Sequence, residues 1–437
     1  MGEPRANPAT SASSEIAARA RRRIARRLLP FLFLLYVIAF LDRVNVAYAA
    51  LEMTQDLGFS PEVFGFGAGI FFIGYFLLEI PGALLVEKWS ARGWIARILI
   101  TWGIATILVG FVRTAPQFYA ARFFLGMAEA GFFPGMIVYL THWFRAADRA
   151  RAVALFMSAI PVSNILGAPV SGMILSVRWL EMPGWRWIFI LEGIPALLFG
   201  CITWFYLTDR PEQAGWLPAE ERDWIVGELE REKRAKQGRR SFTVWEALTH
   251  RDVALLALVY FLGVTGGYGV GFWLPTILKQ LSGLSNLAVA FIAAAPYLLM
   301  LLAMILVGWS SDRRQERRWH TALPLMVTGL GLAASVAARS HLVAAIVLLS
   351  VAASGTWTFA PVFWALPTAI LTEGAAAASI GFINSVGNLG GFAGPYVVGF
   401  LEKRTGSSSA GLAFLVASLL LAGVLVLFLR RSVTRDR

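Results

Sequence analysis

Blocks of about twenty residues with almost no charged side chains recur along this chain, separated by short polar breaks. A helix of roughly 20 apolar residues crosses the 30 Å hydrocarbon core of a bilayer. Inside lipid each backbone polar group must be satisfied within its own segment, so such blocks form helices. The blocks decide the class, because 57% hydrophobic content alone would also fit an apolar soluble core. We predict an all-α membrane protein.

Twelve spans are predicted, six in each half of the chain, with a polar linker over 208–250 between the halves. In the linker, Glu230–Arg234 and Glu232–Lys236 form i,i+4 pairs that favour a solvated surface helix over 219–236. The predicted domains are a disordered basic cytoplasmic tail (1–27), an N-terminal six-helix bundle (28–207), the cytoplasmic linker, a C-terminal six-helix bundle (251–429) and a cytoplasmic tail (430–437). The spans lie near 28–50, 63–86, 94–112, 117–143, 150–175 and 185–207, then 253–279, 287–308, 320–338, 341–371, 375–401 and 410–429.

The net charge of +12 is distributed as the positive-inside rule requires. Most of the 39 Lys and Arg residues lie at the termini and in the loops after even-numbered spans. We therefore expect both termini in the cytoplasm of a bacterial-type inner membrane, with lipids as neighbours and no nucleic-acid partner. The single Cys201 excludes an internal disulfide and offers no metal cluster, so no metal or cofactor is expected.

Four charged side chains stand out within the first-half spans: Asp42, Arg43, Arg122 and Glu129. A charge at the centre of a membrane helix costs about 2.5–3.5 kcal/mol on insertion scales, so each needs a partner or a function. Asp42 and Arg43 are helix neighbours and point about 100° apart. Arg122 and Glu129 lie close to two turns apart and share a face. One interpretation is a structural ion-pair cluster; the other is that the acids exchange protons while one Arg binds an anion.

Two short loops resemble each other and suggest repeated halves. The loop after the second span carries Glu87 and Arg92, and the loop after the eighth carries Gly308, Asp312 and Arg313. The second pattern, Gly-x-x-x-Asp-Arg followed by more bases, resembles the loop motif of the major facilitator superfamily, which implies two six-helix bundles and alternating access. That resemblance implies an acid–base latch of the inward-closed state. Simple positive-inside charge is the alternative, and the first loop departs in its spacing.

Longer strings narrow the resemblance to the anion:cation symporter branch, and within it to the tartrate-transporter group. They are Leu41-Asp42-Arg43-Val44-Asn45, the fourth-span run from Arg122 through Gly126 and Glu129 to Gly135, Trp364-Ala-Leu-Pro367, and the run from Asn384 to Pro395. The match covers about residues 28–428.

The resemblance implies a role for each site residue. Arg43 becomes the carboxylate clamp, Asp42 and Glu129 the protonation sites, and Arg122 the partner of Glu129. Tyr75 and Asn388 are implied to form hydrogen bonds with the substrate, with Asn384 beside them, and Trp364 to line the cavity. The alternatives are hydrogen bonding between helices for the two Asn residues and packing for the two aromatic residues. Phe40 stands where some sugar-acid relatives have Tyr, which weakens a long polyol acid as substrate.

We therefore predict a monomeric transporter, not an enzyme, that takes up a small organic-acid anion with protons. The proton gradient is the energy source, and a tartrate-like hydroxycarboxylate is favoured. The alternatives are uptake of aromatic or sugar-acid carboxylates and proton-driven drug export. Against the second, the intramembrane Arg43 would repel a cationic drug.

Overall fold

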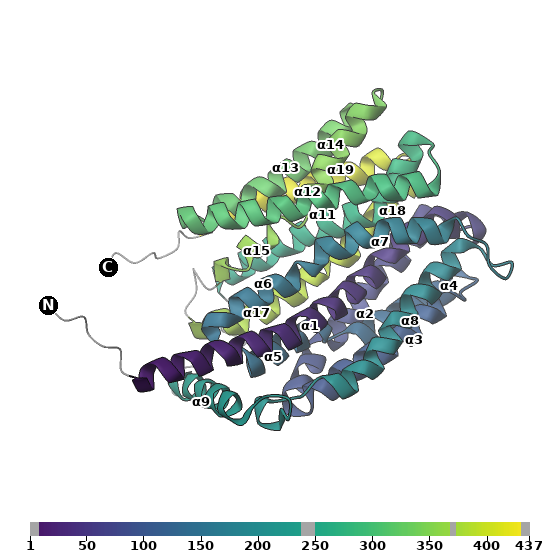
Figure 1. Cartoon of the computed structure of the whole chain (residues 1–437). Coiled ribbons are helices and arrows are strands. Elements are labelled where there is room, and N and C mark those ends of the chain that lie inside the picture. Colours follow the sequence, from purple (N-terminus) through teal and green to yellow (C-terminus); the bar gives the residue numbers. More distant parts are fainter. Residues whose placement is uncertain (1–7, 237–249, 368–372, 430–437) are drawn as a thin grey trace.

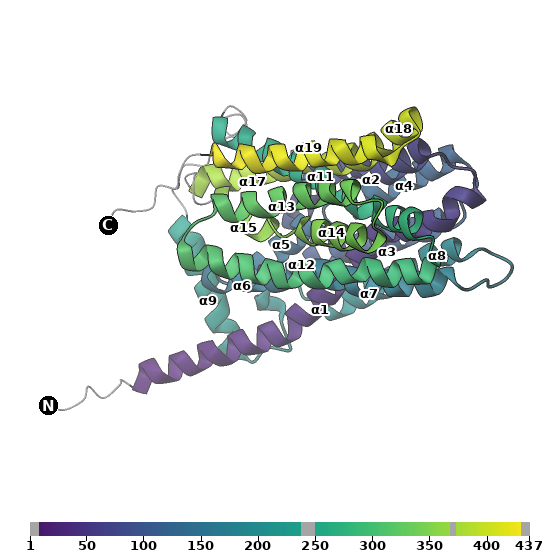
Figure 2. The same ribbon diagram turned by 90° about the horizontal axis from the view of Figure 1, so that it is seen from above.

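Helices aligned side by side in two bundles make up the structure, a computed structural model that describes residues 8–236, 250–367 and 373–429 (Figures 1 and 2). The first half contains α1 (Pro8–Asp56), α2 (Pro61–Lys88), α3 (Ala91–Val109), α4 (Ala115–Glu129), α5 (Phe132–Trp143), α6 (Ala146–Met157), α7 (Ala159–Leu175) and α8 (Gly184–Tyr206), followed by the 3₁₀ turn η1 (Pro211–Gln213) and α9 (Ala219–Lys236). The second half contains α11 (Arg251–Ser282), α12 (Asn286–Arg314), α13 (Arg318–Ala337), α14 (Leu342–Gly355), α15 (Ala360–Phe363), α17 (Glu373–Asn388), α18 (Gly390–Thr405) and α19 (Ser408–Leu427).

The all-α prediction is confirmed, and within the described residues eleven helical stretches are long and apolar enough to cross a membrane. The predicted span 375–401 consists of α17 and α18 in succession, of 16 residues each, and so falls below that length. The predicted span 117–143 is α4 and α5, which are separated at Gly131. Gly131 has φ +84°, in the left-handed region that glycine adopts without a side-chain clash, so the break is set by this residue.

The N-terminal segment differs from the prediction. A disordered tail over residues 1–27 is wrong for residues 8–27, which are the first turns of α1; residues 1–7 lie outside the described chain. The segment is rich in Ala and Arg, both strong helix formers. It is also anchored: Arg23 forms an ion pair with the buried Glu221 of α9 at 3.0 Å, and Arg19 lies 3.9 Å from the same carboxylate.

The predicted linker helix is present as α9, with one ion pair as expected. Arg234 and Glu230 pair at 3.4 Å. Glu232 pairs with Arg149 of α6 at 3.2 Å, while the side chain of Lys236, its predicted partner, lies outside the described residues. The helix is therefore attached to the first bundle by ion pairs as well as to the start of α1, and it marks one end of the molecule, the α9 end (Figure 1).

The two bundles pack through α1 against α11, α2 against α18 and α7 against α12. Contact is closest at the end opposite α9. A Cβ added to Gly65 of α2 would lie 2.4 Å from the Pro395 carbonyl oxygen, and one added to Gly399 would lie 2.2 Å from the Pro61 carbonyl oxygen. Lys403 and Glu62 form an ion pair there at 2.5 Å. Backbone approaches this close require glycine, so the bundles are tightly joined at this end.

Candidate transport site

A small pocket of about 50 Å³ lies between the two bundles. Its wall is largely aromatic, as is common in sites for small molecules. All five residues predicted to bind substrate line it, although they come from α1, α2 and the α15–α17 region. The lining residues are Tyr36, Phe40, Arg43, Tyr75, Phe133, Met157, Ile160, Tyr260, Tyr268, Met304, Trp357, Ala360, Trp364, Asn384 and Asn388.

Arg43 of α1 is the pocket's cation, and it is nearly buried at 9% exposure. Its Nη2 donates to Oε1 of Glu129, and its Nη1 donates to the Tyr268 hydroxyl of the other bundle at 3.2 Å. The guanidinium carbon lies 5.2 Å from the Tyr75 ring centroid, within cation–π range. These contacts hold the guanidinium in a fixed orientation, and its planar set of donors matches the geometry of a carboxylate.

Asp42 points away from Arg43, as their neighbouring positions on the helix predict. It is 1% exposed and is not among the residues that line the pocket. Its carboxylate accepts hydrogen bonds from Trp102 Nε1 of α3 at 2.5 Å and from Asn45 Nδ2 at 3.0 Å. Asp42 is therefore held behind the pocket wall, inside the first bundle.

The pairing of Glu129 differs from the prediction. Arg122 and Glu129 are both fully buried, but the hydrogen bond to Glu129 comes from Arg43 rather than Arg122. Arg122 instead donates from Nη2 to the Ala68 carbonyl at 3.5 Å and lies over the Phe71 ring. The seven-residue spacing correctly put both side chains on buried positions of α4. It carried no information on which arginine of the bundle reaches the carboxylate, because α1 supplies it.

Two further buried acids were missed in the sequence. Glu79 of α2 is 4% exposed, and Glu192 of α8 is 7% exposed and accepts a hydrogen bond from Ser171 at 2.9 Å. Both interrupt predicted apolar spans, so the cost of an intramembrane charge was a signal that could have identified them. Asp42 and Glu129 are therefore not the only acids buried in the first bundle.

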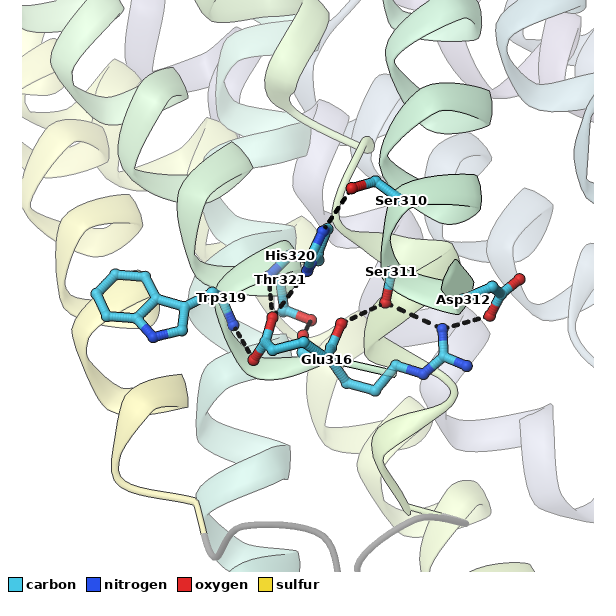
Figure 3. Close-up of polar contacts among 8 residues, drawn as sticks. Ser310, Ser311, Asp312, Glu316, Trp319, His320 and Thr321 are labelled. Atoms are coloured by element: carbon cyan, nitrogen blue, oxygen red, sulfur yellow. Dashed lines mark hydrogen bonds and ion pairs between the residues drawn. The ribbon is translucent and has the colours of Figure 1, made fainter. Parts of the chain in front are cut away.

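Two of the predicted gating residues, Asp312 and Arg313, lie in the last turn of α12, and Figure 3 shows the contacts of Asp312 there. Asp312 pairs at 2.5 Å with Arg317, which directly precedes α13, and the Arg317 guanidinium also donates to Ser311 at 3.0 Å. The other, Arg313, lies over the Trp309 ring, 5.4 Å from its centroid. The contacts of Asp312 thus brace the turn from α12 to α13 within the second bundle.

Glu316 closes this loop by capping α13. Its carboxylate accepts from the backbone N–H groups of Trp319 at 2.8 Å and His320 at 3.2 Å, and it contacts His320 Nδ1 at 2.7 Å (Figure 3). Burial alone would raise the pKa of Glu316, but these hydrogen bonds and the neighbouring imidazole hold it below its usual value. The loop is thereby fixed at the start of α13.

The junction between α2 and α3 is braced by an acid that follows α8 in the chain. Asp209 accepts from the Arg92 backbone N–H at 2.7 Å and from the Ser90 hydroxyl at 2.8 Å. The Arg92 guanidinium lies over Trp204. The side chain of the fourth predicted gating residue, Glu87, lies outside the described residues. Sequence reasoning missed Asp209 as the acid of this loop.

Two helical bundles around a central pocket with a buried cation define a membrane transporter of the major facilitator type. The chain matches the profile of the Major Facilitator Superfamily over residues 32–395, and it belongs to that family. It is a transporter, not an enzyme.

Three curated relatives match nearly the whole chain. The "Putative tartrate transporter" of Agrobacterium vitis is 47% identical over 96% of this chain and 93% of that protein. The "Quinolone resistance transporter" of Acinetobacter baumannii is 36% identical over 95% of this chain and 96% of that protein. The "Inner membrane transport protein RhmT" of Escherichia coli is 37% identical over 92% of this chain and 94% of that protein.

Solved structures share the fold at low sequence identity. A bacterial homolog of the human lysosomal transporter Spinster superposes with a TM-score of 0.73 at 18% identity, covering 93% of this chain and 95% of that one. The xylose transporter XylE from E. coli gives a TM-score of 0.71 at 15% identity, covering 94% of this chain and 99% of that one.

Proposed function

We propose that this protein takes up a small organic-acid anion together with protons by alternating access, with a tartrate-like hydroxycarboxylate as the favoured substrate. The observation that carries the proposal is Arg43, a nearly buried guanidinium in an aromatic pocket between the two bundles. A buried cation at the central site favours an anionic cargo. The similarity to proteins named as tartrate transporters supports a hydroxylated carboxylate.

Coupling follows from the hydrogen bond between Arg43 and Glu129. While Glu129 is ionised it holds the Arg43 fork, since the ion pair satisfies both charges. A proton on Glu129 removes that negative charge and frees the guanidinium to bind the carboxylate of the substrate. Loss of the proton on the opposite side restores the pair and expels the anion. Proton and anion therefore travel in the same direction.

The electrical cost makes more than one proton necessary for a dianion. Moving two negative charges against a negative-inside potential of 100 mV costs about 4.6 kcal/mol, at about 2.3 kcal/mol for each charge. Two accompanying protons cancel that charge, and a third makes uptake electrically favourable. Asp42 is proposed as a second carrier, with Arg122 as the buried cation that balances it inside the first bundle. The loops with Arg92 and Asp312 are proposed to stabilise the inward-closed state.

The proposed orientation places the α9 end in the cytoplasm of a bacterial inner membrane. The Arg residues at the start of α1 and the charged α9 lie at that end, and the positive-inside rule assigns such an end to the cytoplasm. Anionic lipid headgroups are the expected neighbours of this surface. The transporter is proposed to act as a monomer, because the pocket is complete within one chain.

Proton-driven drug export is the second candidate, favoured by the 36% identity to the quinolone resistance transporter. Arg43 opposes a purely cationic drug, but quinolones carry a carboxyl group that suits the same clamp. Uptake of aromatic or sugar-acid carboxylates uses the clamp as well. The aromatic wall of the pocket favours aromatic carboxylates, and Phe40 in the pocket disfavours a sugar acid with a long polyol chain.

Purified transporter in proteoliposomes tests the proposal. With an acidic exterior, radiolabelled tartrate is expected to accumulate inside, and unlabelled aromatic or sugar acids are expected to compete more weakly. Accumulation driven equally well by sodium without a pH gradient would contradict proton coupling. Quinolone efflux from cells expressing the protein, with no tartrate uptake in the vesicles, would establish the export candidate instead.

A further inference from the structure

Glu79 holds a contact between the two bundles that the proposed mechanism does not use. It lies on α2 one turn beyond Tyr75 and is almost completely buried. Among the described residues, its hydrogen-bond donors are three side chains of α17 in the other bundle. Asn384 Nδ2 donates to Oε1, Ser385 Oγ lies 3.3 Å from Oε2, and Asn388 Nδ2 lies 3.2 Å from Oε2. A carboxylate only accepts, so these donors satisfy its charge only while the bundles are together here.

The same α17 amides line the central pocket together with Arg43. The pocket therefore has two sets of donors suited to a carboxylate, one in each bundle. Each set is occupied by a glutamate of the first bundle: Glu129 on Arg43, and Glu79 on the pair Asn384 and Asn388. In the structure, carboxylates of the protein itself occupy the hydrogen-bond donors that a substrate carboxylate would need.

We propose that the amides of Asn384 and Asn388 form a second carboxylate subsite and that Glu79 is its resident internal ligand. This inference rests on the proposed function, because it assigns the subsite to the second carboxylate of a dicarboxylate substrate. In the empty transporter Glu79 links the bundles. When the substrate carboxylate takes the amides, Glu79 leaves them and takes up one proton from solvent in the pocket. It returns that proton when the link forms again.

The surroundings of Glu79 fit this exchange. The charged and titratable groups that act on it are Arg43 of α1, Tyr75 of its own helix and Tyr260 of α11; the α17 donors are neutral. Among these groups Glu79 is the one carboxylate, and Arg43 already pairs with Glu129. A displaced Glu79 would thus be a buried charge with no cation to itself, which favours its protonation.

A fixed structural contact is the competing explanation, and ligand binding separates the two. The probes are tartrate, with two carboxylates, and threonate, in which a hydroxymethyl group replaces one of them. If Glu79 occupies the subsite, Glu79→Ala is expected to bind tartrate about tenfold more tightly, since apparent affinity falls with the fraction of sites that is free. Threonate affinity should stay unchanged. Asn384→Ala is expected to weaken tartrate and leave threonate unaffected.

Glu62→Gln is the matched control, because it breaks the ion pair with Lys403 between the same two bundles but outside the pocket. It should leave both affinities at the parent value. The proposal is overturned if Glu79→Ala binds tartrate no more tightly than the parent, or if the affinities for both acids change alike.

A second measurement does not depend on the substrate. Spin labels at Trp89→Cys and Trp319→Cys report the separation of the bundles at the α9 end, in a Cys201→Ser background; both tryptophans are exposed. Glu79→Gln places an NH₂ donor against the amide donors, so it should shift the distances of the acid-free protein to longer values. An unchanged distribution in a folded variant overturns the link. Should the parent bind neither acid, the proposed substrate class fails while this measurement still decides the role of Glu79.

Discussion

Replacing Arg43 by Lys tests the carboxylate clamp while keeping the positive charge. Arg43 uses two different nitrogens for Glu129 and Tyr268, whereas Lys offers one ammonium group at the end of a flexible stem. A hydrogen bond to a charged group contributes about 1.5–3 kcal/mol net. Losing one such bond to the substrate therefore weakens binding roughly tenfold to a hundredfold, at 1.4 kcal/mol for each factor of ten.

The assay is titration calorimetry of tartrate against the purified transporter, with a melting curve for each variant. Arg122→Lys is the matched control, because Arg122 is also buried in the first bundle but does not line the pocket. It should alter stability more than affinity. Arg43→Ala is less informative, since it leaves Glu129 buried without its cation at a cost of about 3–5 kcal/mol. An Arg43→Lys variant that melts normally and binds tartrate as tightly as the parent would refute the clamp.

Other contacts described above support three further predictions. Glu129→Gln is expected to lose accumulation driven by a pH gradient but to keep counterflow, which needs no net proton movement; normal accumulation would make Glu129 only a structural partner of Arg43. Deleting residues 1–18 should change uptake little, since the ion pairs of α1 with α9 begin at Arg19; lost uptake at normal membrane levels would contradict this. The folded-state pKa of Glu316 is depressed, so its stabilising effect is present above the unfolded value near 4.5 and is lost as the pH falls through the folded value. Glu316→Gln should therefore lower the stability at neutral pH by about 1 kcal/mol, the usual cost of a lost cap, and have little effect in strong acid, as checked by melting curves.

The fold was largely predictable because hydrocarbon thickness and backbone hydrogen bonding leave a charge-poor block few alternatives. What hydropathy could not give is the conformation within a block. The break after Glu129 depends on the left-handed backbone of Gly131, and a window of mean hydropathy averages over it. The ordered start of α1 was missed for another reason: its Arg residues look like a solvated tail until the acids of α9 are placed beside them.

The residues that line the candidate site were easier to predict than the contacts that they make with one another. The motifs brought Arg43, Tyr75, Asn384 and Asn388 to one pocket although they are far apart in the chain. Helical periodicity acts within a single helix, so it could not tell which arginine would meet Glu129. Glu79 was predictable from the sequence, because an acid in the middle of an apolar run carries the same cost as Asp42 or Glu129.

The glycines where the bundles meet at the end opposite α9 also offer a way to capture a single conformation. Gly65 and Gly399 each leave no room for a methyl group against a backbone carbonyl of the other bundle. Alanine at either position would penalise the closed arrangement of that end without touching the pocket, since neither residue lines it. Such chains would be suitable antigens for raising antibody fragments that recognise the transporter with that end open.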